Sequence, residues 1–359
     1  MYSPGFPSDH KWLVDAKKAG CALLGELDFA SLFWKGKIIA VTGTNGKTTI
    51  TSFITRSLKR LGVNAIAAGN IGIPLSRILL ESNSQESTIV CETSSFQAEE
   101  IKYFSPDVLI WSNFAEDHLN RYDSLDSYFK AKLNLVQRLK SEQLYIGKSV
   151  LTYANENKHS LPKGARVIEL DDISTAKIPE NSIFKSYPQQ ENYLLVKKFW
   201  DENKYPESSL KQTVASFTLP EHRLQKIGEL KGIHFWNDSK ATNFSATIAA
   251  LRSFPHPVLW IGGGLQKGGD LKAFARSVSY YIKKAYIIGS VSDSLAQEFN
   301  QLDIAVSTYE NLNQAVNAAF KDSTSPEEIV FSPGFASFDM YPSFAHRGNA
   351  FLNDFNHLK

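Results

Sequence analysis

One stretch constrains the fold of this chain more than any other: the run IIAVTGTNGKTT at residues 38–49. Its apolar, β-branched beginning is typical of a buried strand, and the segment 52–61 that follows has the composition of a helix. Between them, Gly43 and Gly46 allow the backbone to curl so that successive N–H groups point inward. The N-terminus of the following helix adds partial positive charge. The run therefore predicts an α/β fold with an anion-binding turn.

The residues of this turn point to a nucleoside triphosphate. Lys47 can reach the outer phosphates, and the Thr48 hydroxyl can ligate Mg²⁺. The usual spacing G-x-x-x-x-G-K-[ST] is not met, because Val41 occupies the place of the first glycine and leaves the shorter G-T-N-G-K-T. The alternative is a plain glycine turn between a strand and a helix, with a surface lysine.

Length and composition restrict the other possibilities. A chain of 359 residues exceeds one ordinary core, and its net charge of +2 does not favour nucleic acid or an anionic membrane surface. Cys21 and Cys91 cannot form a disulfide framework, and no apolar stretch approaches the roughly 18 residues of a membrane span. We expect a cytoplasmic protein that acts on small molecules.

Short apolar runs alternate with amphipathic segments in two parts of the chain, as in parallel sheets covered by helices. The first part predicts strands at 37–42, 88–92, 108–113 and 143–146, and the second at 233–237, 258–262, 285–289, 304–308 and 327–332. Helices are expected at 243–253, 271–279, 291–300 and 312–321. Residues 151–186 are interpreted as a β-rich excursion, and a domain boundary is expected between 217 and 232.

Two polar side chains, Glu92 and His118, end or follow predicted strands of the first part, at the rim where open α/β sheets bind ligands. Glu92 ends STIVCE and is either a Mg²⁺ ligand or the cap of the next helix. His118, in NFAEDHLNRY, is either functional or structural. Lys132 lies with Lys130 on a predicted helix at 124–139, where a solvated helix face is the ordinary interpretation. In the last part, WNDSKATN, GGGLQKGGD and SPGFASFD follow strands in the same way.

Together these motifs resemble the Mur ligase superfamily. The superfamily signal comprises GTNGKTT (43–49), E-x-S-S (92–95), N-x-x-E-D-H (113–118), HR (222–223) and NDSKATN (237–243). A second set is similar to the branch that adds D-glutamate: GNIGIP (69–74), SSFQ (94–97), EDHLNRY (116–122), SPGFASFD (332–339) and FAHRGNAF (344–351). The resemblance runs from Ser3 to the C-terminus.

The resemblance implies a monomeric ligase of peptidoglycan precursor synthesis that uses ATP and Mg²⁺. ATP would phosphorylate the carboxylate of UDP-N-acetylmuramoyl-L-alanine, and the amine of D-glutamate would attack the resulting acyl phosphate. Phosphoryl transfer requires positioning and charge neutralisation more than a protein nucleophile. A site made of lysines, hydroxyls and carboxylates suits that requirement.

By motif, the resemblance assigns these residues to four tasks. The catalytic set is Lys47, Glu92, His118, Lys132 and Lys240. The nucleotide-binding set is Gly43, Thr44, Asn45, Gly46, Lys47, Thr48, Thr49, Asn192, Arg223 and Asp238. The metal ligands are Thr48, Glu92, His118 and Lys132, with Lys132 carbamylated so that it becomes anionic. Asn70 and Ser94 would contact the muramoyl-alanine part, and D-glutamate would be received by Thr242, Lys267, Ser337 and Phe344.

The implied domains are a remnant of an N-terminal UDP-binding α/β domain at 1–34, a central P-loop-like ATPase domain at 35–224 and a C-terminal Rossmann-like domain at 225–359. Closure of the last domain onto the central one would assemble the site. In the remnant we expect a helix near 9–19 and a strand at 21–25. Either the chain is a fragment or it binds UDP in an altered way. In both cases we expect it to bind Mg²⁺-ATP and to use the UDP substrate poorly.

Two other functions stay open. A related ligase with another acceptor, in the folylpolyglutamate-synthesising branch, is opposed by SSFQ and SPGFASFD. An inactive nucleotide-binding descendant is compatible with the short start. Separately, YPQQENY (187–193) keeps only Asn192 of the family's G-x-H-N-x-x-N, so the expected contacts to adenine depart from the family pattern. Amino-acid-dependent phosphate release would separate an enzyme from a binder.

Overall fold

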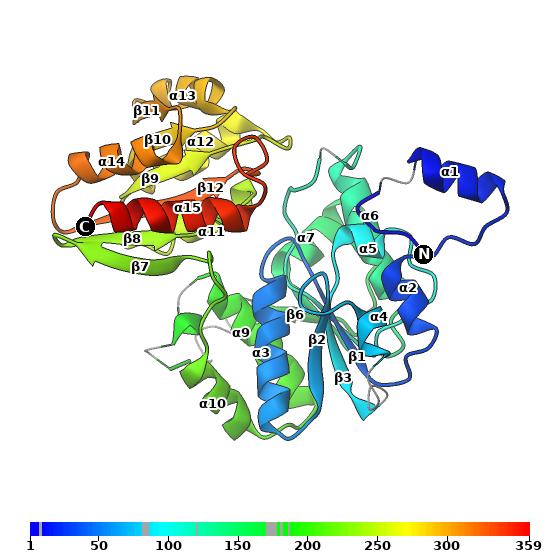
Figure 1. Cartoon of the computed structure of the whole chain (residues 1–359). Helices are drawn as coiled ribbons and strands as arrows, with labels where there is room; N and C mark the ends of the chain where they lie inside the picture. The colour runs from blue at the N-terminus through cyan, green and yellow to red at the C-terminus, as the bar shows by residue number, and fades with distance from the viewer. Residues whose placement is uncertain (7–8, 81–85, 120, 170–177, 180–181, 186) are drawn as a thin grey trace. The chain divides into compact units, whose positions relative to one another are not determined.

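The computed structural model describes residues 1–6, 9–80, 86–119, 121–169, 178–179, 182–185 and 187–359. It divides into two compact units; in Figure 1 the first runs from blue to green, and the second runs from green to red apart from its short cyan segment 116–120. The first unit comprises Met1–Ala115 and Arg121–Thr218, and the second comprises Glu116–Asn120 and Leu219–Lys359. Each unit has its own six-stranded sheet covered by helices, which confirms the α/β class predicted from the sequence.

The first unit is built on a parallel sheet with the strand order β2-β3-β1-β4-β5-β6. Its strands are β1 (Ile38–Thr42), β2 (Ala65–Gly69), β3 (Thr88–Glu92), β4 (Val108–Trp111), β5 (Leu144–Gly147) and β6 (Arg166–Ile168). The four predicted strands are present; β2 was not predicted, and β6 lies within residues 151–186, which were expected to be β-rich. After β1 the chain crosses over β3 to form β2, and after β3 it crosses over β1 to form β4. The chain therefore leaves the adjacent strands β1 and β3 in opposite directions. Open sheets bind ligands at such a switch point.

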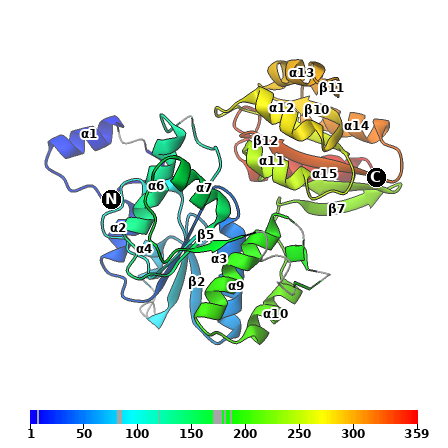
Figure 2. The same cartoon turned by 180° about the vertical axis from the view of Figure 1, so that it is seen from behind.

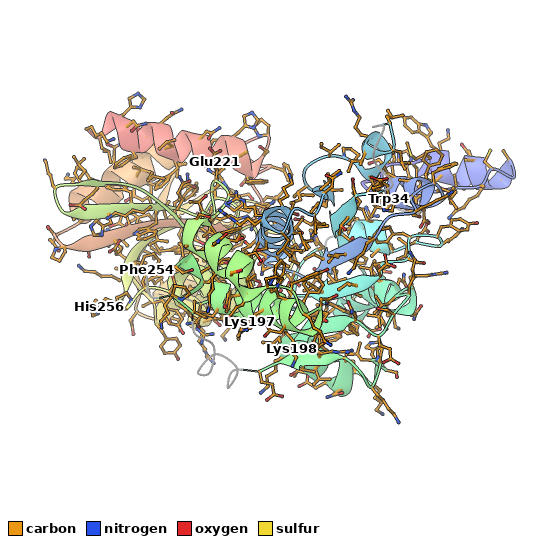
Figure 3. The ribbon with its side chains drawn as sticks, turned by 90° about the horizontal axis from the view of Figure 1, so that it is seen from below. Trp34, Lys197, Lys198, Glu221, Phe254 and His256 are labelled. Carbon is orange, nitrogen blue, oxygen red and sulfur yellow. The ribbon has the colours of Figure 1, made fainter. Side chains whose placement is uncertain are left out.

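Helices cover both faces of this sheet, which explains why its central strands are almost entirely apolar. One face packs in a cluster with α2 (Glu26–Ser31), α4 (Leu75–Ile78), α6 (Leu125–Gln137) and α7 (Lys148–Glu156). The other face is covered by α3 (Lys47–Arg60) and α9 (Gln189–Glu202), with α10 (Glu207–Ser216) against them, as Figure 2 shows from behind. On the outer side of α9, Lys197 and Lys198, labelled in Figure 3, pair with acidic residues one turn later. Because β1 and β3 are parallel neighbours, their carboxyl ends lie side by side at one edge of the sheet.

Two local predictions in this unit were wrong. Residues 21–25 do not form a strand; Gly25 makes a single bridge with Tyr2, because Pro4 and Gly5 turn the partner segment away. Residues 151–156 belong to helix α7 rather than to a β-rich excursion, since Val150 and Ala154 recur at helical spacing and are buried against the sheet. The rest of that predicted excursion falls partly outside the described residues. The helix expected near 9–19 is present as α1 (Lys11–Lys18).

The second unit has the strand order β11-β10-β9-β12-β8-β7. Its strands are β7 (Gln225–Leu230), β8 (Ile233–Asn237), β9 (Val258–Gly263), β10 (Ile282–Ile288), β11 (Ala305–Tyr309) and β12 (Glu327–Gly334). Only β7 is antiparallel to its neighbour. One face packs against α14 (Leu312–Asp322) and α15 (Phe344–His357), and the other against α11 (Phe244–Leu251), α12 (Leu271–Ser279) and α13 (Ser292–Asn300). All five predicted strands are present, whereas β7 and α15 were not predicted.

Among the described residues, no helix combines the length and the apolar composition that a membrane crossing requires.

Candidate functional site

The loop between β1 and α3 has the geometry of a phosphate cradle. Gly43 has a φ of 146°, and a Cβ there would lie 1.9 Å from Ser112 Oγ; Gly46 has a φ of 83° and begins the helix as its N-cap. Among the described residues, no side chain caps α3, and its first turn contains no acidic residue. The amide groups at a helix start and the helix dipole favour an anion at this point.

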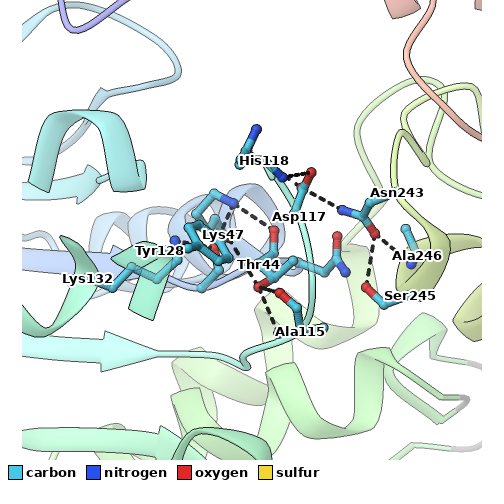
Figure 4. Close-up of polar contacts among 12 residues, drawn as sticks. Thr44, Lys47, Ala115, Asp117, His118, Tyr128, Lys132, Asn243, Ser245 and Ala246 are labelled. Carbon is cyan, nitrogen blue, oxygen red and sulfur yellow. Dashed lines mark hydrogen bonds and ion pairs between the residues drawn. The ribbon is translucent and has the colours of Figure 1, made fainter. Parts of the chain in front are cut away.

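Asn113, which sequence reasoning did not select, holds this loop in place. Its side-chain Oδ1 accepts the Asn45 N–H at 2.9 Å, and its carbonyl accepts the Thr44 N–H at 3.1 Å. Thr44 also donates its hydroxyl to the carbonyl of Ala115 at 3.1 Å (Figure 4). The signal that could have identified Asn113 is its position directly behind β4, next to the loop that follows β1.

Lys47 lies folded over the loop. Its Nζ donates to the carbonyl of Gly43 at 2.9 Å and to that of Thr44 at 2.8 Å. The ammonium group is thereby held against the backbone of the turn (Figure 4). The Thr48 and Thr49 side chains follow in the first turn of α3, with Thr49 buried.

Glu92 projects from the end of β3, whose neighbour is β1. Its side chain is 2% exposed, Oε1 accepts the Asn70 side-chain N–H at 2.9 Å, and Oε2 is buried with no hydrogen-bond partner among the described residues. A buried carboxylate oxygen without a partner is costly unless a ligand satisfies it. Glu92 does not cap the next helix, because Ser94 and Gln97 form that capping box. The helix-cap alternative is therefore excluded.

Lys132 of α6 is 1% exposed, so it does not belong to a solvated helix face. Its Nζ donates to the carbonyl of Gly43 at 3.0 Å and lies 4.9 Å from the centre of the Tyr128 ring. Lys130, two residues earlier, is 62% exposed and pairs with Asp126. The two lysines of YFKAKL thus differ completely in environment, and only Lys132 reaches the phosphate loop.

Asn192 approaches the loop at Gly46, whereas Lys132 approaches it at Gly43. Asn192 is 4% exposed, and its Oδ1 would be 2.4 Å from a Cβ at position 46, so Gly46 is required for the close approach. Its Nδ2 donates to Gln189 Oε1 at 2.9 Å. The phosphate loop, Asn70, Glu92, Lys132 and Asn192 therefore lie around one rim of the first sheet.

A small cavity of about 30 Å³ in the second unit brings further predicted residues together. His118, Thr242 and Lys267 line it, together with Glu116, Asp117, Leu119, Asn243, Phe244, Gly268, Gly334 and Phe335. Asn243 donates to Asp117 Oδ2 at 2.9 Å and accepts the Ala246 N–H as the cap of α11 (Figure 4). Burial, followed by the nearby Asp270 and Asp117, raises the pKa of Glu116. His118 has a φ of 59°, and its N–H donates to Asp117 Oδ1.

Asp238 and Lys240 lie behind β8. Asp238 is 8% exposed and accepts the Leu224 N–H at 2.9 Å and the Ser332 hydroxyl at 2.7 Å. Burial raises the pKa of Asp238 to about 7, against the lowering effect of these bonds and of Arg223 and Arg347. Lys240 Nζ lies 3.8 Å from the centre of the Phe344 ring. Ser337 is buried and lies two residues after Phe335, which lines the small cavity. Neither Ser337 nor Phe344 is among the described residues that line that cavity.

Arg347 is a structural residue of this unit that sequence reasoning missed. It is 1% exposed and donates to Ser239 Oγ, to the Ser239 carbonyl and to the carbonyls of Phe335 and Ala336. It therefore joins the loops that carry Lys240 and Ser337 to helix α15. Its presence in FAHRGNAF was visible, but a lone arginine in an amphipathic helix gives no sign of burial.

The side chains around the phosphate loop can be compared with the ligands that a metal ion requires. Among the described residues, no group of three His, Cys, Asp or Glu side chains is arranged as a metal site. The unpartnered Glu92 oxygen and the Thr48 hydroxyl, both beside the phosphate loop, are nonetheless oxygen donors of the type that Mg²⁺ takes alongside phosphate oxygens. The first unit therefore suits a Mg²⁺ that arrives with a nucleotide.

Comparison with known proteins agrees with this architecture. Residues 41–215 match the Mur ligase middle domain, and residues 222–334 match the Mur ligase, glutamate ligase domain. Proteins named UDP-N-acetylmuramoylalanine--D-glutamate ligase are similar along the chain. That of Caldicellulosiruptor saccharolyticus is 31% identical over 100% of this chain and 84% of its own length, and that of Natranaerobius thermophilus is 34% identical over 97% and 82%.

Solved structures share the fold. The UDP-N-acetylmuramate-alanine ligase of Thermotoga maritima has a TM-score of 0.65 at 16% identity, covering 99% of this chain and 85% of its own. Escherichia coli FolC in complex with ADP has a TM-score of 0.63 at 15% identity and covers 100% of both chains. The identity to the first group of relatives extends over both units, and the chain therefore belongs to the Mur ligase family, among the UDP-N-acetylmuramoylalanine–D-glutamate ligases.

Proposed function

We propose that this protein is an ATP-dependent ligase that joins D-glutamate to UDP-N-acetylmuramoyl-L-alanine in peptidoglycan precursor synthesis. The observation that carries the proposal is the identity of 31–34% to enzymes of that name over at least 97% of the chain. The phosphate loop, with Lys47 above it and the unpartnered Glu92 oxygen beside it, supplies the chemistry that such a reaction needs. A cytoplasmic location is part of the proposal.

In the first unit, the proposed task is activation of the substrate carboxylate. A carboxylate resists attack by an amine until one of its oxygens becomes a good leaving group, and phosphorylation by ATP provides this. The uncapped start of α3 would hold the phosphates next to Thr44 and Asn45, whose loop Asn113 fixes, with Lys47 neutralising the charge on the transferring group. Mg²⁺ would be held by Thr48, Glu92 and carbamylated Lys132 of this unit, and when bound it would neutralise phosphate charge. His118, the fourth ligand that the resemblance implies, lines the small cavity of the second unit.

In the second unit, the proposed task is to bind and orient D-glutamate. Thr242 and Lys267 line one small cavity, and a lysine together with a hydroxyl suits a carboxylate of the amino acid. Ser337 and Phe344 are proposed to contact the remainder of D-glutamate. Asp238 and Arg223, beside β8, are proposed to contact the nucleotide, with Lys240 near the transferring phosphate.

The test is phosphate release from ATP with each acceptor supplied separately. Release that requires both UDP-N-acetylmuramoyl-L-alanine and D-glutamate, and yields the amide by mass spectrometry, would support the proposal. Release with a folate and L-glutamate would instead assign the chain to the folylpolyglutamate branch. Nucleotide binding without turnover under any of these conditions would identify an inactive descendant.

A further inference from the structure

The carboxylate of Asp117, in the motif EDHLNRY, joins two segments of the second unit that lie 126 residues apart in the sequence. Its Oδ1 accepts the N–H of the next residue, His118, at 2.8 Å, and its Oδ2 accepts the side-chain N–H of Asn243 at 2.9 Å. The Asp117 side chain is 8% exposed. One carboxylate oxygen therefore closes a local turn, and the other fixes that turn to the segment that follows β8 (Figure 4).

This turn places His118 in an uncommon backbone conformation. The φ angle of His118 is 59°, in the left-handed region that residues other than glycine adopt infrequently. Such a conformation persists only where the surrounding structure enforces it. His118 Nε2 lies 3.6 Å from Asp117 Oδ2, the same oxygen that Asn243 reaches. The backbone and the imidazole of His118 thus both depend on one carboxylate.

Asn243 is fixed on its other side by helix α11. It is the N-cap of that helix, and its Oδ1 accepts the Ala246 N–H at 2.9 Å and the Ser245 hydroxyl at 3.0 Å. Because the amide oxygen belongs to the cap, the amide nitrogen faces Asp117. Serine, threonine and aspartate also cap helices well, but only asparagine among these residue types carries an N–H donor beside the capping oxygen. A helix cap by itself therefore does not explain why this position is an asparagine.

The side chains joined in this way lie around the small cavity of the second unit. Asp117 and Asn243 line it together with three residues to which the resemblance assigns roles, His118, Thr242 and Lys267. Under the proposed function, this cavity takes part of D-glutamate, whose amine must be brought to the activated carboxylate. Displacement of a positioning group by about 1 Å can lower a rate by about 10²-fold. A side chain that fixes the wall of the cavity therefore contributes to the reaction without touching the reacting atoms.

We propose that Asn243 is a positioning residue: through the Asp117 carboxylate it holds the turn at residues 116–119, and with it His118, in the place that the D-glutamate site requires. The inference rests on the proposed function for the identity of the ligand. It differs from a helix-capping role, because it depends on the side-chain N–H of Asn243 and on the direction of one hydrogen bond. Two substitutions that conserve shape can reverse that direction.

The experiment reverses this hydrogen bond in the full chain. Asn243→Asp keeps a capping oxygen, as Asp270 provides for helix α12, but it directs a second carboxylate at Asp117. Combining Asn243→Asp with Asp117→Asn restores one donor and one acceptor in the opposite order, and it leaves an oxygen at position 117 for the His118 N–H. Asn311→Asp makes the same substitution at the N-cap of α14 in the same unit and is the matched control.

Calorimetry measures the dissociation constant of D-glutamate in the presence of UDP-N-acetylmuramoyl-L-alanine and a non-hydrolysable ATP analogue, and separately that of the analogue. Steady-state kinetics give the KM values for D-glutamate and for ATP. Hydrogen exchange of the His118 amide reports on the turn in the absence of any ligand, and thermal unfolding reports stability.

For Asn243→Asp, we expect the dissociation constant of D-glutamate to rise about tenfold or more, which corresponds to about 1.4 kcal/mol. The KM for D-glutamate should rise with it, whereas binding of the ATP analogue should stay within about twofold of the unmodified protein. Exchange of the His118 amide should accelerate. The double variant should recover most of the D-glutamate affinity and slow the exchange again, and Asn311→Asp should change none of these quantities.

Unchanged D-glutamate affinity in Asn243→Asp would overturn the inference. A double variant that binds D-glutamate no better than Asn243→Asp would do the same, because a cap alone predicts no recovery. An equal loss of affinity for both ligands, accompanied by a lower unfolding temperature, would also contradict a positioning role.

The two proposals fail separately, because exchange at His118 is measured without ligand. If the reversed bond restores slow exchange but the unmodified protein forms no amide with D-glutamate, the proposed function alone is contradicted. A ligase whose Asn243→Asp variant binds D-glutamate and turns over normally would contradict this inference alone.

Discussion

At the scale of single residues, burial decides what each lysine of the first unit can do. Lys130 is 62% exposed and pairs with Asp126 in solvent, whereas Lys132 is 1% exposed beside the phosphate loop. Lys47 is held over the same loop by two carbonyls. Three lysines within one unit therefore have three different environments, and two of them can influence a phosphate.

Replacing Lys47 by alanine should abolish ligation while leaving the fold intact. The substitution removes the cation next to the migrating negative charge, and a loss of several kcal/mol corresponds to roughly 10³-fold or more in rate. Initial rates of phosphate release, with Lys130→Ala as the control, measure the effect. Ligation by Lys47→Ala at a rate near that of the control would contradict the assigned role.

Lys132→Ala should also lose activity, and a short carboxylic acid in the buffer should restore part of it. The reason is that a carbamylated lysine is an anionic metal ligand, so a small carboxylate can take its place. Mass spectrometry of the native protein checks for the carbamate directly. Full activity in Lys132→Ala would show that the buried amine has only a structural role.

Asp238 should make the stability of the second unit depend on pH. Burial raises the pKa of Asp238 from 3.8 to about 7, so between these values the folded protein holds a proton that the unfolded chain has released. The stabilisation is complete below about pH 4, declines as the pH rises, and is lost above about pH 7. Since each unit of pKa corresponds to about 1.4 kcal/mol, the total change should be a few kcal/mol.

Asp238→Asn is the matched variant, because an amide can accept the Leu224 N–H and donate to Ser332 without carrying a charge. Denaturant unfolding in the absence of nucleotide, between pH 5 and pH 8, should lose this part of its pH dependence in the variant. Identical pH profiles for the two proteins would show that folding does not raise the pKa of Asp238.

At the scale of elements, helix α2 shows how residues 26–31 are attached to the first unit. Asp28 is 2% exposed and accepts the backbone N–H groups of Lys102, Tyr103 and Phe104 at 2.8–3.0 Å. Glu26 accepts the N–H of Ser76 at 2.6 Å. Two acidic side chains of one short helix thereby satisfy backbone donors of two other segments, and Leu27 and Ala30 join the apolar cluster.

Asp28→Asn should lower the free energy of unfolding by roughly 2–4 kcal/mol. An amide offers one acceptor oxygen to three backbone donors and lacks the negative charge, and hydrogen bonds to charged groups contribute about 1.5–3 kcal/mol each. Denaturant unfolding measures the loss, with Asp15→Asn on α1 as the control for an acidic helix residue. A change below about 0.5 kcal/mol would mean that the N–H groups of residues 102–104 find other hydrogen-bond acceptors in the variant.

At the scale of the whole molecule, the chain has separate apolar clusters in its two units. Calorimetry should therefore resolve two unfolding transitions. Asp28→Asn should move only the transition of the first unit, and a change from pH 5 to pH 8 should move that of the second through Asp238. A single transition displaced by both changes would show that the units unfold as one.

The order and type of the elements follow largely from the sequence, because strands buried on both faces must be continuously apolar. Nine strands were predicted within a few residues of their observed bounds. The strand β7 escaped prediction since half of its residues are exposed, and α15 since its buried face contains a glycine and an arginine. Residues 21–25 have a strand composition but form one bridge, because among the described residues the partner segment turns away after Tyr2.

The sequence by itself determined the phosphate loop, since glycine spacing and the lysine behind it depend only on local backbone geometry. It also placed Glu92 at the end of a strand and Lys132 on a helix. Only the tertiary structure decided that Glu92 has a buried oxygen without a partner among the described residues, that Lys132 is enclosed while Lys130 is exposed, and that Asn243 and Arg347 hold distant segments together. The physical reason is that burial and hydrogen bonding depend on neighbours contributed by segments far away along the chain.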